Sequence, residues 1–113
     1  MDCIFCKIVS GEIPSTKVFE NDKVLAFRDL NPVAPVHILV IPKKHVGSVN
    51  DITDENVEYI SEIFKVIPEI VKQEGISDSG YRIVSNNGDD AGQTVHHLHF
   101  HILGGRKFSD GME

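Results

Sequence analysis

The alternation of apolar and polar positions predicts a short helix and then three strands within the first 42 residues. The helix is expected over residues 3–9, capped by Asp2 and ended by the turn signal Ser10-Gly11. The segments "KVFEN" and "KVLAFRD" predict a hairpin whose polar turn is Asn21-Asp22. The apolar run "VHILVIP" predicts a buried strand, which its final proline ends.

The next segment, over residues 53–75, has the periodicity of one long helix. Five apolar positions recur at helical spacing and predict its buried face, namely Val57, Ile60, Phe64, Ile67 and Val71. Thr53 or Asp54 would cap its start, and Gly75 would end it. Pro68 should kink the helix or split it, because proline has no N–H to donate.

Two further strands, "YRIVSNN" and "TVHHLHFHIL", follow the helix and are separated by the loop "GDDAG". Five strands with one long helix between the third and the fourth are typical of an α+β domain with a mainly antiparallel sheet. No repeat, low-complexity tract or linker interrupts the 113 residues. The sequence therefore predicts a single domain over residues 1–113, with one long and one short helix.

The charge balance limits the partners. The net charge of −6 argues against nucleic acid as the main partner, but it allows a small anion held by amides and polar side chains. The longest apolar run, Ile38–Ile41, is far too short to span a membrane, and "MDCIFCKIV" lacks the pattern of a signal peptide. A cytoplasmic protein that binds neither membranes nor nucleic acid is expected.

The segment "HHLHFHIL" places imidazoles at alternate positions of the last predicted strand. His97, His99 and His101 should share one face, while the apolar residues at 98, 100 and 102 face a core. A stripe chosen for solubility would use threonine, lysine or glutamate instead. Two chemical explanations remain: the histidines bind a catalytic metal, or they perform nucleophilic and acid–base chemistry themselves.

The loop before this strand favours the second explanation. It carries Gly88, Gly92, Gln93 and Thr94, whose amides and hydroxyl can hold an anion, although the Walker motif is absent and a plain β-turn is the alternative. A neutral imidazole has a nitrogen free to attack phosphorus, and its neighbours can donate to the phosphoryl oxygens. The middle histidine, His99, is the natural nucleophile. The pattern predicts phosphoryl or nucleotidyl transfer.

The same segments resemble a known family. "HHLHFHIL" matches the histidine triad pattern, and "DLNPVAPVHILVIPKKH" at 29–45 and "NNGDDAGQTVHHLHFHILGGR" at 86–106 are similar to the Hint branch of that family. The resemblance extends over nearly the whole chain. It implies a histidine triad (HIT) fold, a homodimer with one continuous sheet, and a hydrolase of purine nucleoside 5′-phosphoramidates.

The resemblance also implies catalytic roles for individual residues. His99 would attack the α-phosphorus and form a nucleotidyl-histidine intermediate, which water then hydrolyses. His37, His101 and Thr94 would hold the phosphate oxygens and assist proton transfer to the leaving amine. An alternative for His37 is a core histidine bonded to the backbone.

The substrate-binding residues implied by the resemblance fall into three groups. Asp29 would accept hydrogen bonds from the ribose hydroxyls, with capping of the "NPVAP" turn as its alternative. The phosphate end would be lined by Asn86, Gly92 and Gln93, and the base would lie between Phe5, Ile13, Phe27 and Leu30. Ordinary core packing is the alternative for these four apolar residues. The tail "KFSDGME" departs from the family, because it lacks the tryptophan-containing ending, and this leaves the leaving-group preference open.

Cys3 and Cys6 lie three positions apart, which on a helix places both thiols on one face about 5–6 Å apart. This arrangement suits two corners of a tetrahedral zinc site, with His45 and His97 as the other ligands. The resemblance supports such a site, since some bacterial members and the related galactose-phosphate uridylyltransferases have a comparable Cys-Cys-His-His set. This zinc would be structural, so hydrolysis would need no added metal. Two free thiols or a redox disulfide are the alternatives.

Three other functions stay open from the sequence. In a dinucleoside polyphosphate hydrolase, the same chemistry would expel a nucleotide instead of an amine. A purine nucleotide sensor or scaffold would bind AMP with little turnover. A metal-dependent hydrolase would lose its activity in the presence of a chelator.

Overall fold

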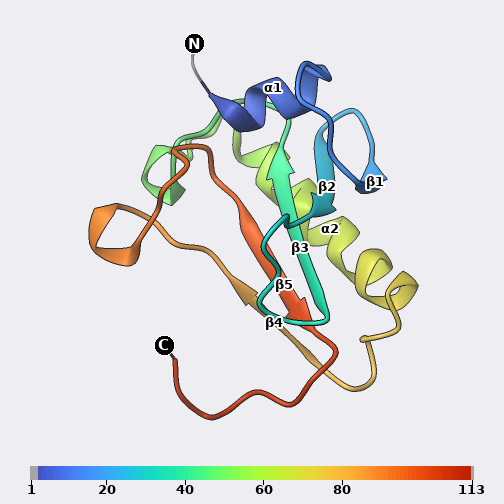
Figure 1. The fold of residues 1–113 in the computed structure, drawn as a ribbon. Coiled ribbons are helices and arrows are strands. Elements are labelled where there is room, and N and C mark those ends of the chain that lie inside the picture. Colours follow the sequence, from blue (N-terminus) through green and yellow to red (C-terminus); the bar gives the residue numbers. More distant parts are fainter. Residues whose placement is uncertain (1–2, 113) are drawn as a thin grey trace.

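The computed structural model describes residues 3–112, and its five strands form one antiparallel sheet in the order β1-β2-β3-β5-β4 (Figure 1). The strands are β1 (Lys17–Glu20), β2 (Val24–Arg28), β3 (Val36–Pro42), β4 (Tyr81–Val84) and β5 (Phe100–Gly104). The helices are α1 (Ile4–Ser10) and α2 (Val57–Gln73), with short 3₁₀ turns at Val49–Asp51 and Asp89–Ala91. The predicted α+β class, with one long and one short helix, is confirmed.

The sheet carries apolar side chains on both faces. With α2, one face forms a core that contains Val24, Ala26, Ile38, Val40, Phe100 and Ile102. With α1, the other face forms a second core that contains Phe5, Ile8, Leu25, Phe27, Leu39 and Ile41. In Figure 1, α2 lies behind the sheet, and α1 crosses near the end at which β3 finishes. Alternate residues of β2 and β3 therefore pack under different helices.

α1 begins one residue later than predicted. Its N-cap is Cys3, whose Sγ accepts a hydrogen bond from the Cys6 N–H at 3.3 Å. The predicted cap, Asp2, lies outside the described residues. Gly11 ends the helix with a φ of +85°, a left-handed conformation that glycine adopts without a Cβ clash. The cap fixes the Cys3 thiol beside the turn that carries Cys6.

α2 buries Ile67 and Val71 as predicted, but the rest of its buried face differs from the prediction. Its buried positions are Ile63, Val66, Ile67, Ile70 and Val71. Val57 and Phe64, which were predicted to be buried, are 42% and 48% exposed. The buried set follows i, i+3, i+4, i+7 and i+8, which defines a wider apolar stripe than the predicted spacing. Pro68 lies on the exposed side and does not split the helix, because water can hydrate the carbonyl that loses its partner there.

The start of α2 also differs from the prediction. Neither Thr53 nor Asp54 is the cap, since Asn56 precedes the first helical residue. Asn56 Oδ1 accepts a hydrogen bond from the Thr53 N–H at 2.8 Å, so these two residues close a turn before the helix.

Within residues 3–112, no helix combines the length and the apolar character needed to cross a membrane.

β5 is shorter than the strand predicted over residues 94–103, since its sheet pairing begins only at Phe100. Its partner β3 ends at Pro42, two residues beyond the Val40–Phe100 pair, and proline has no N–H to extend the ladder. The Leu98 N–H bonds instead to the Val46 carbonyl oxygen at 2.6 Å. Residues 94–99 therefore run beside a loop and not within the sheet.

The side chains of residues 97–102 nevertheless alternate between the two sides of the sheet, as predicted. The rings of His97 and His99 pack against Phe5 of α1, with centroids 5.9 and 5.1 Å apart. The apolar residues at 98, 100 and 102 belong to the core under α2. The imidazoles consequently lie on the side of the sheet that α1 covers.

Candidate active site and metal centre

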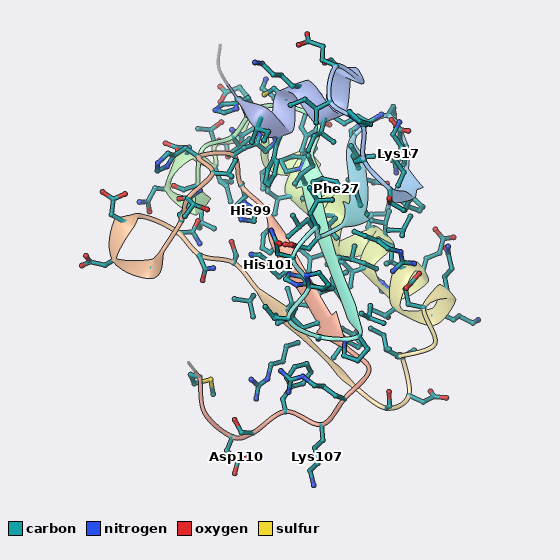
Figure 2. All side chains as sticks on the ribbon, in the orientation of Figure 1. Lys17, Phe27, His99, His101, Lys107 and Asp110 are labelled. Carbon is teal, nitrogen blue, oxygen red and sulfur yellow. The ribbon has the colours of Figure 1, made fainter. Side chains whose placement is uncertain are left out.

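A cavity of about 280 Å³ lies between α1 and the sheet, on the side that carries the histidines. Figure 2 shows His99 and His101 beside Phe27. Eight residues predicted from the sequence line this cavity: Phe5, Ile13, Phe27, Asp29, Leu30, Thr94, His99 and His101. Leu30 is 91% exposed and lies at the rim, whereas Phe5 and Phe27 are buried. The cavity therefore joins an apolar part to a polar part that contains imidazoles.

His99 is held in one tautomer. Its Nδ1 lies 2.7 Å from the carbonyl oxygen of His97, which can only accept, so Nδ1 carries the proton and donates it. In the neutral ring, the lone pair is then on Nε2, and this ring lines the cavity. The edge of Phe5 packs against this ring at 5.1 Å between centroids and restricts its rotation. A buried imidazole with an unprotonated nitrogen at a cavity wall is arranged as a nucleophile.

His37 and His101 form a second hydrogen-bonded pair. The Val33 N–H donates to His37 Nδ1 at 3.1 Å, so the His37 proton is on Nε2. This Nε2 lies 2.9 Å from His101 Nδ1 and donates to it. His101 consequently keeps its own proton on Nε2. That N–H is a donor for a group bound in the cavity that His101 lines.

Burial controls the charge of this pair. Burial, and then the charges of the neighbouring His99 and His37, lower the pKa of His101 to about 4. Burial also lowers the pKa of His37, against the opposing effect of the Asp29 carboxylate, whose Oδ2 lies 3.4 Å from His37 Nε2. Both rings are therefore neutral at pH 7, and each can donate one proton and accept another.

Asp29 caps a turn and also lines the cavity. Its Oδ1 accepts a hydrogen bond from the Asn31 N–H at 2.7 Å, which is the capping alternative that the sequence offered. Its Oδ2 faces His37. The cap fixes the direction of the carboxylate, and the second oxygen keeps lone pairs for a donor in the cavity.

Three residues predicted at the phosphate end have other surroundings. Gln93 is buried, and its side-chain amide bonds to three backbone groups at 2.7, 2.9 and 3.1 Å. Gly92 donates its N–H within its own turn at 3.0 Å, and Asn86 is half-buried. Among the described residues 3–112 that line the cavity, none of these three is found. Gln93 holds the loop in place, and a contact of these residues with phosphate stays a prediction.

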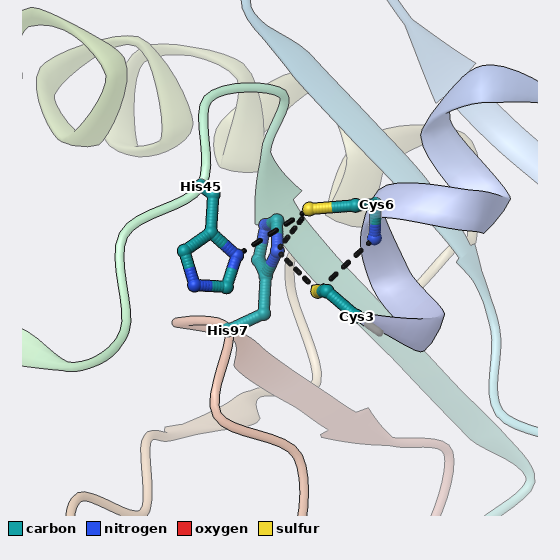
Figure 3. A group of neighbouring side chains, drawn as sticks. All are labelled: Cys3, Cys6, His45 and His97. Carbon is teal, nitrogen blue, oxygen red and sulfur yellow. Dashed lines mark hydrogen bonds between the residues drawn. The ribbon is translucent and has the colours of Figure 1, made fainter. Parts of the chain in front are cut away.

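The four side chains predicted as zinc ligands meet beside α1 (Figure 3). The donor atoms of Cys3, Cys6, His45 and His97 all lie within 4.8 Å of one another. The sulfur–nitrogen distances are 3.3 Å from Cys3 to His97, and 3.4 and 3.6 Å from Cys6 to His45 and to His97. Tetrahedral zinc, with bonds of about 2.3 Å to sulfur and 2.0–2.1 Å to nitrogen, gives a sulfur–nitrogen edge of roughly 3.6 Å. The observed spacing fits this geometry.

The chemistry of the four donors agrees with the fit. His97 is fully buried and donates from Nε2 to the Pro42 carbonyl oxygen at 2.8 Å, so its Nδ1 lone pair faces both thiols. Burial and the neighbouring Cys3 raise the pKa of Cys6 to about 11, and burial lowers the pKa of His97 to about 4. A divalent cation would favour thiolates and would use the neutral imidazole. The cluster can therefore hold a zinc ion.

Asp29, His37 and His101 are also close together, but this group is built differently. The Val33 N–H occupies His37 Nδ1, so His37 Nε2 must keep its proton and has no lone pair for a metal. The group is therefore suited to hydrogen bonding and proton transfer, and it does not fit a cation.

Val33 and Ser15 were not predicted from the sequence. The backbone N–H of Val33 fixes the His37 tautomer, and a backbone donor leaves no signal in the residue types. Ser15 lines the cavity. It lies two positions after Ile13, and alternation along an extended segment would have placed both on one side.

Comparison with known proteins identifies the family. The HIT domain family model matches residues 10–108, so the chain belongs to the histidine triad family, as its motifs predicted. The purine nucleoside phosphoramidase of Escherichia coli (strain K12) is 45% identical over 105 residues, which cover 93% of this chain and 88% of the relative. The 14 kDa zinc-binding protein of Zea mays is 47% identical over 108 residues, which cover 94% of this chain and 84% of the relative.

A solved structure agrees with this assignment. A histidine triad protein from Clostridium difficile is 58% identical and superposes with a TM-score of 0.94, over 98% of this chain and 96% of that chain. The fold of this chain is thus the HIT fold. Similarity at this level supports a hydrolase of the HIT family.

Proposed function

We propose that this protein hydrolyses purine nucleoside 5′-phosphoramidates to a nucleoside monophosphate and an amine. One observation carries the proposal. The 2.7 Å hydrogen bond from His99 Nδ1 to the His97 carbonyl places the lone pair of the neutral ring on Nε2 at the cavity wall. The name of the E. coli relative, at 45% identity, supports the substrate class.

The reaction would proceed in two displacements. His99 Nε2 attacks the α-phosphorus, the phosphorus–nitrogen bond breaks, and the leaving amine takes the Nε2 proton of His101, which the water of the second displacement later restores. The His101 N–H and the Thr94 hydroxyl donate to the phosphoryl oxygens, while His37 orients His101. Water then attacks the nucleotidyl-histidine, His99 leaves with its lone pair restored, and the proton of the water returns to the histidine pair.

The nucleoside would occupy the rest of the same cavity. Asp29 Oδ2 would accept hydrogen bonds from the ribose hydroxyls, and the base would lie against Phe5, Ile13, Phe27 and Leu30. A volume of about 280 Å³ is at the small end of ligand sites. This size favours one nucleoside with its leaving group outside, and it disfavours a dinucleotide enclosed as a whole.

We also propose that Cys3, Cys6, His45 and His97 hold a structural zinc ion. The donor spacing supports it, and so does the name of the maize relative. Bound zinc would supply a crosslink between α1 and the loops of the two histidines. Because α1 also carries Phe5, this crosslink would stabilise one wall of the cavity. The chemistry at His99 would need no further metal.

The chain is further proposed to form a homodimer with a continuous sheet. β4 is an outer strand, and its Tyr81 and Ile83 side chains are 36% and 39% exposed. Pairing of β4 with a second copy would satisfy its free edge and cover these side chains. Light scattering should give about twice the chain mass of 12.6 kDa, and a monomer at micromolar concentration would contradict this assembly.

The substrate proposal is tested by following AMP release from adenosine 5′-phosphoramidate and, separately, from diadenosine tetraphosphate. The phosphoramidate should be lost faster. His99→Ala should still bind AMP but lose turnover, while His96→Ala, at an exposed neighbouring histidine, should keep it. Equal turnover by wild type and His99→Ala would exclude nucleophilic catalysis at this residue. Faster loss of the tetraphosphate would favour the dinucleotide hydrolase, and AMP binding without turnover would identify a sensor.

A further inference from the structure

Ser15 carries an unsatisfied hydroxyl. Within residues 3–112, its Oγ is the one buried side-chain oxygen or nitrogen that has no hydrogen-bond partner. An unpaired buried hydroxyl costs folding free energy, and an alanine at this position would avoid that cost. The residue itself is half-buried and lines the cavity. Ser15 therefore lines the cavity with a hydroxyl that no protein group holds, and a rotation of its side chain can bring this hydroxyl to a bound ligand.

Two polar side chains that line the same cavity as Ser15, those of Arg28 and Asp29, have partners of their own. The carbonyl oxygen of the next residue, Thr16, accepts from the Arg28 N–H at 3.0 Å, which sets Ser15 beside the end of β2. The Arg28 guanidinium bonds to both carboxylate oxygens of Glu74 at 3.0 Å each. Asp29 Oδ1 accepts from the Asn31 N–H at 2.7 Å, and Asp29 Oδ2 faces His37 Nε2 at 3.4 Å. These groups leave the Ser15 hydroxyl free for a bound molecule.

In the proposed nucleotide complex, the base is the part that lacks a polar partner. The histidines and Thr94 serve the phosphate, and Asp29 serves the ribose. The base would meet apolar side chains such as Phe5 and Phe27, and its ring nitrogens and exocyclic groups would lose water without compensation. The unpaired hydroxyl and the unpaired edge of the base therefore complement each other.

We propose that Ser15 is a specificity-determining residue that hydrogen-bonds the polar edge of the bound purine base. This inference rests on the proposed nucleotide site. A hydroxyl can both donate and accept, so it can pair with a ring nitrogen or with an exocyclic group. Rotation about the single Cα–Cβ bond turns Oγ between staggered positions, and no existing hydrogen bond opposes the rotation, since Oγ has none.

The test compares wild type with Ser15→Ala by calorimetric titration with AMP and with ribose 5-phosphate, which lacks the base. AMP should bind about three- to tenfold more weakly to the variant, the loss expected for one neutral hydrogen bond. Ribose 5-phosphate should bind both proteins equally. Urea unfolding should show that the variant is at least as stable as wild type, because it loses a hydroxyl that has no partner in the folded chain.

Ser10→Ala is the matched control. The Ser10 hydroxyl donates to the Lys7 carbonyl oxygen at 3.0 Å outside the cavity, so its loss should leave AMP affinity unchanged. Equal AMP affinity of Ser15→Ala and wild type would overturn the role of Ser15 alone. Reduced stability of Ser15→Ala, or weaker ribose 5-phosphate binding, would also overturn it. A wild-type protein that binds neither ligand would instead overturn the nucleotide site itself, and the role of Ser15 with it.

Discussion

Acidification should weaken the folded state through His101. Its pKa is about 4 in the folded chain against 6.5 for a free side chain. Between these values the unfolded chain binds the additional proton, so the free energy of unfolding falls as the pH falls from 7 to 4. The difference between 6.5 and about 4, at about 1.36 kcal/mol per pKa unit, sets an upper limit of roughly 3 kcal/mol for this one residue.

The assay is urea unfolding of wild type and His101→Asn at pH values from 7.5 to 4.5. The variant loses the bond from His37 at every pH, but it has no imidazole to titrate at this position. The stability difference between the two proteins should therefore shrink by about 2–3 kcal/mol on acidification. Other groups, such as His97, titrate in both proteins and cancel. Parallel pH curves would show that His101 does not take up a proton on unfolding in this pH range. His96→Asn, at an exposed position, is the control and should parallel wild type.

The remaining predictions concern packing and metal content. Gly104→Ala should lower the free energy of unfolding by about 1–3 kcal/mol, because a Cβ there would lie 2.7 Å from Ile76 Cδ1. Gly111→Ala, whose Cβ would lie 3.7 Å from Ser109 Oγ, should unfold like wild type in the same urea titration, and equal midpoints for both variants would contradict the clash. Freshly purified wild type should contain about one zinc per chain by atomic absorption and Cys3→Ser much less. Less than a tenth of an equivalent in wild type would remove the zinc proposal.

Regular alternation explains why much of the fold could be predicted from the sequence. The "HHLHFHIL" segment assigned imidazoles to one side and apolar residues to the other, and this assignment survives although only residues 100–104 pair within the sheet. The spacing of Cys3 and Cys6 likewise predicted a shared helical face, and the structure brings both thiols to His45 and His97. Such periodic patterns are local, and local geometry follows from them directly.

Features that depend on contacts between distant segments could not be predicted. The start of β5 pairing at Phe100 depends on Pro42 in another strand, and the buried face of α2 depends on which of its apolar stripes meets the sheet. The tautomers of the histidine pair depend on the Val33 N–H, a backbone group whose position no residue type reveals. The Ser15 hydroxyl stands out only in the folded structure, where it is buried and has no hydrogen-bond partner.

Nucleophilic attack by His99 can be tested by mass spectrometry after brief exposure to adenosine 5′-phosphoramidate and quenching in an alkaline denaturant, because the phosphorus–nitrogen bond to imidazole is labile in acid. Wild type should show a transient mass increase of one adenylyl group, which peptide mapping locates on the His99 peptide and which is absent from His99→Ala. An adenylyl group on another residue, an equal adduct on His99→Ala, or full turnover with no adduct at any quench time would contradict nucleophilic attack by His99.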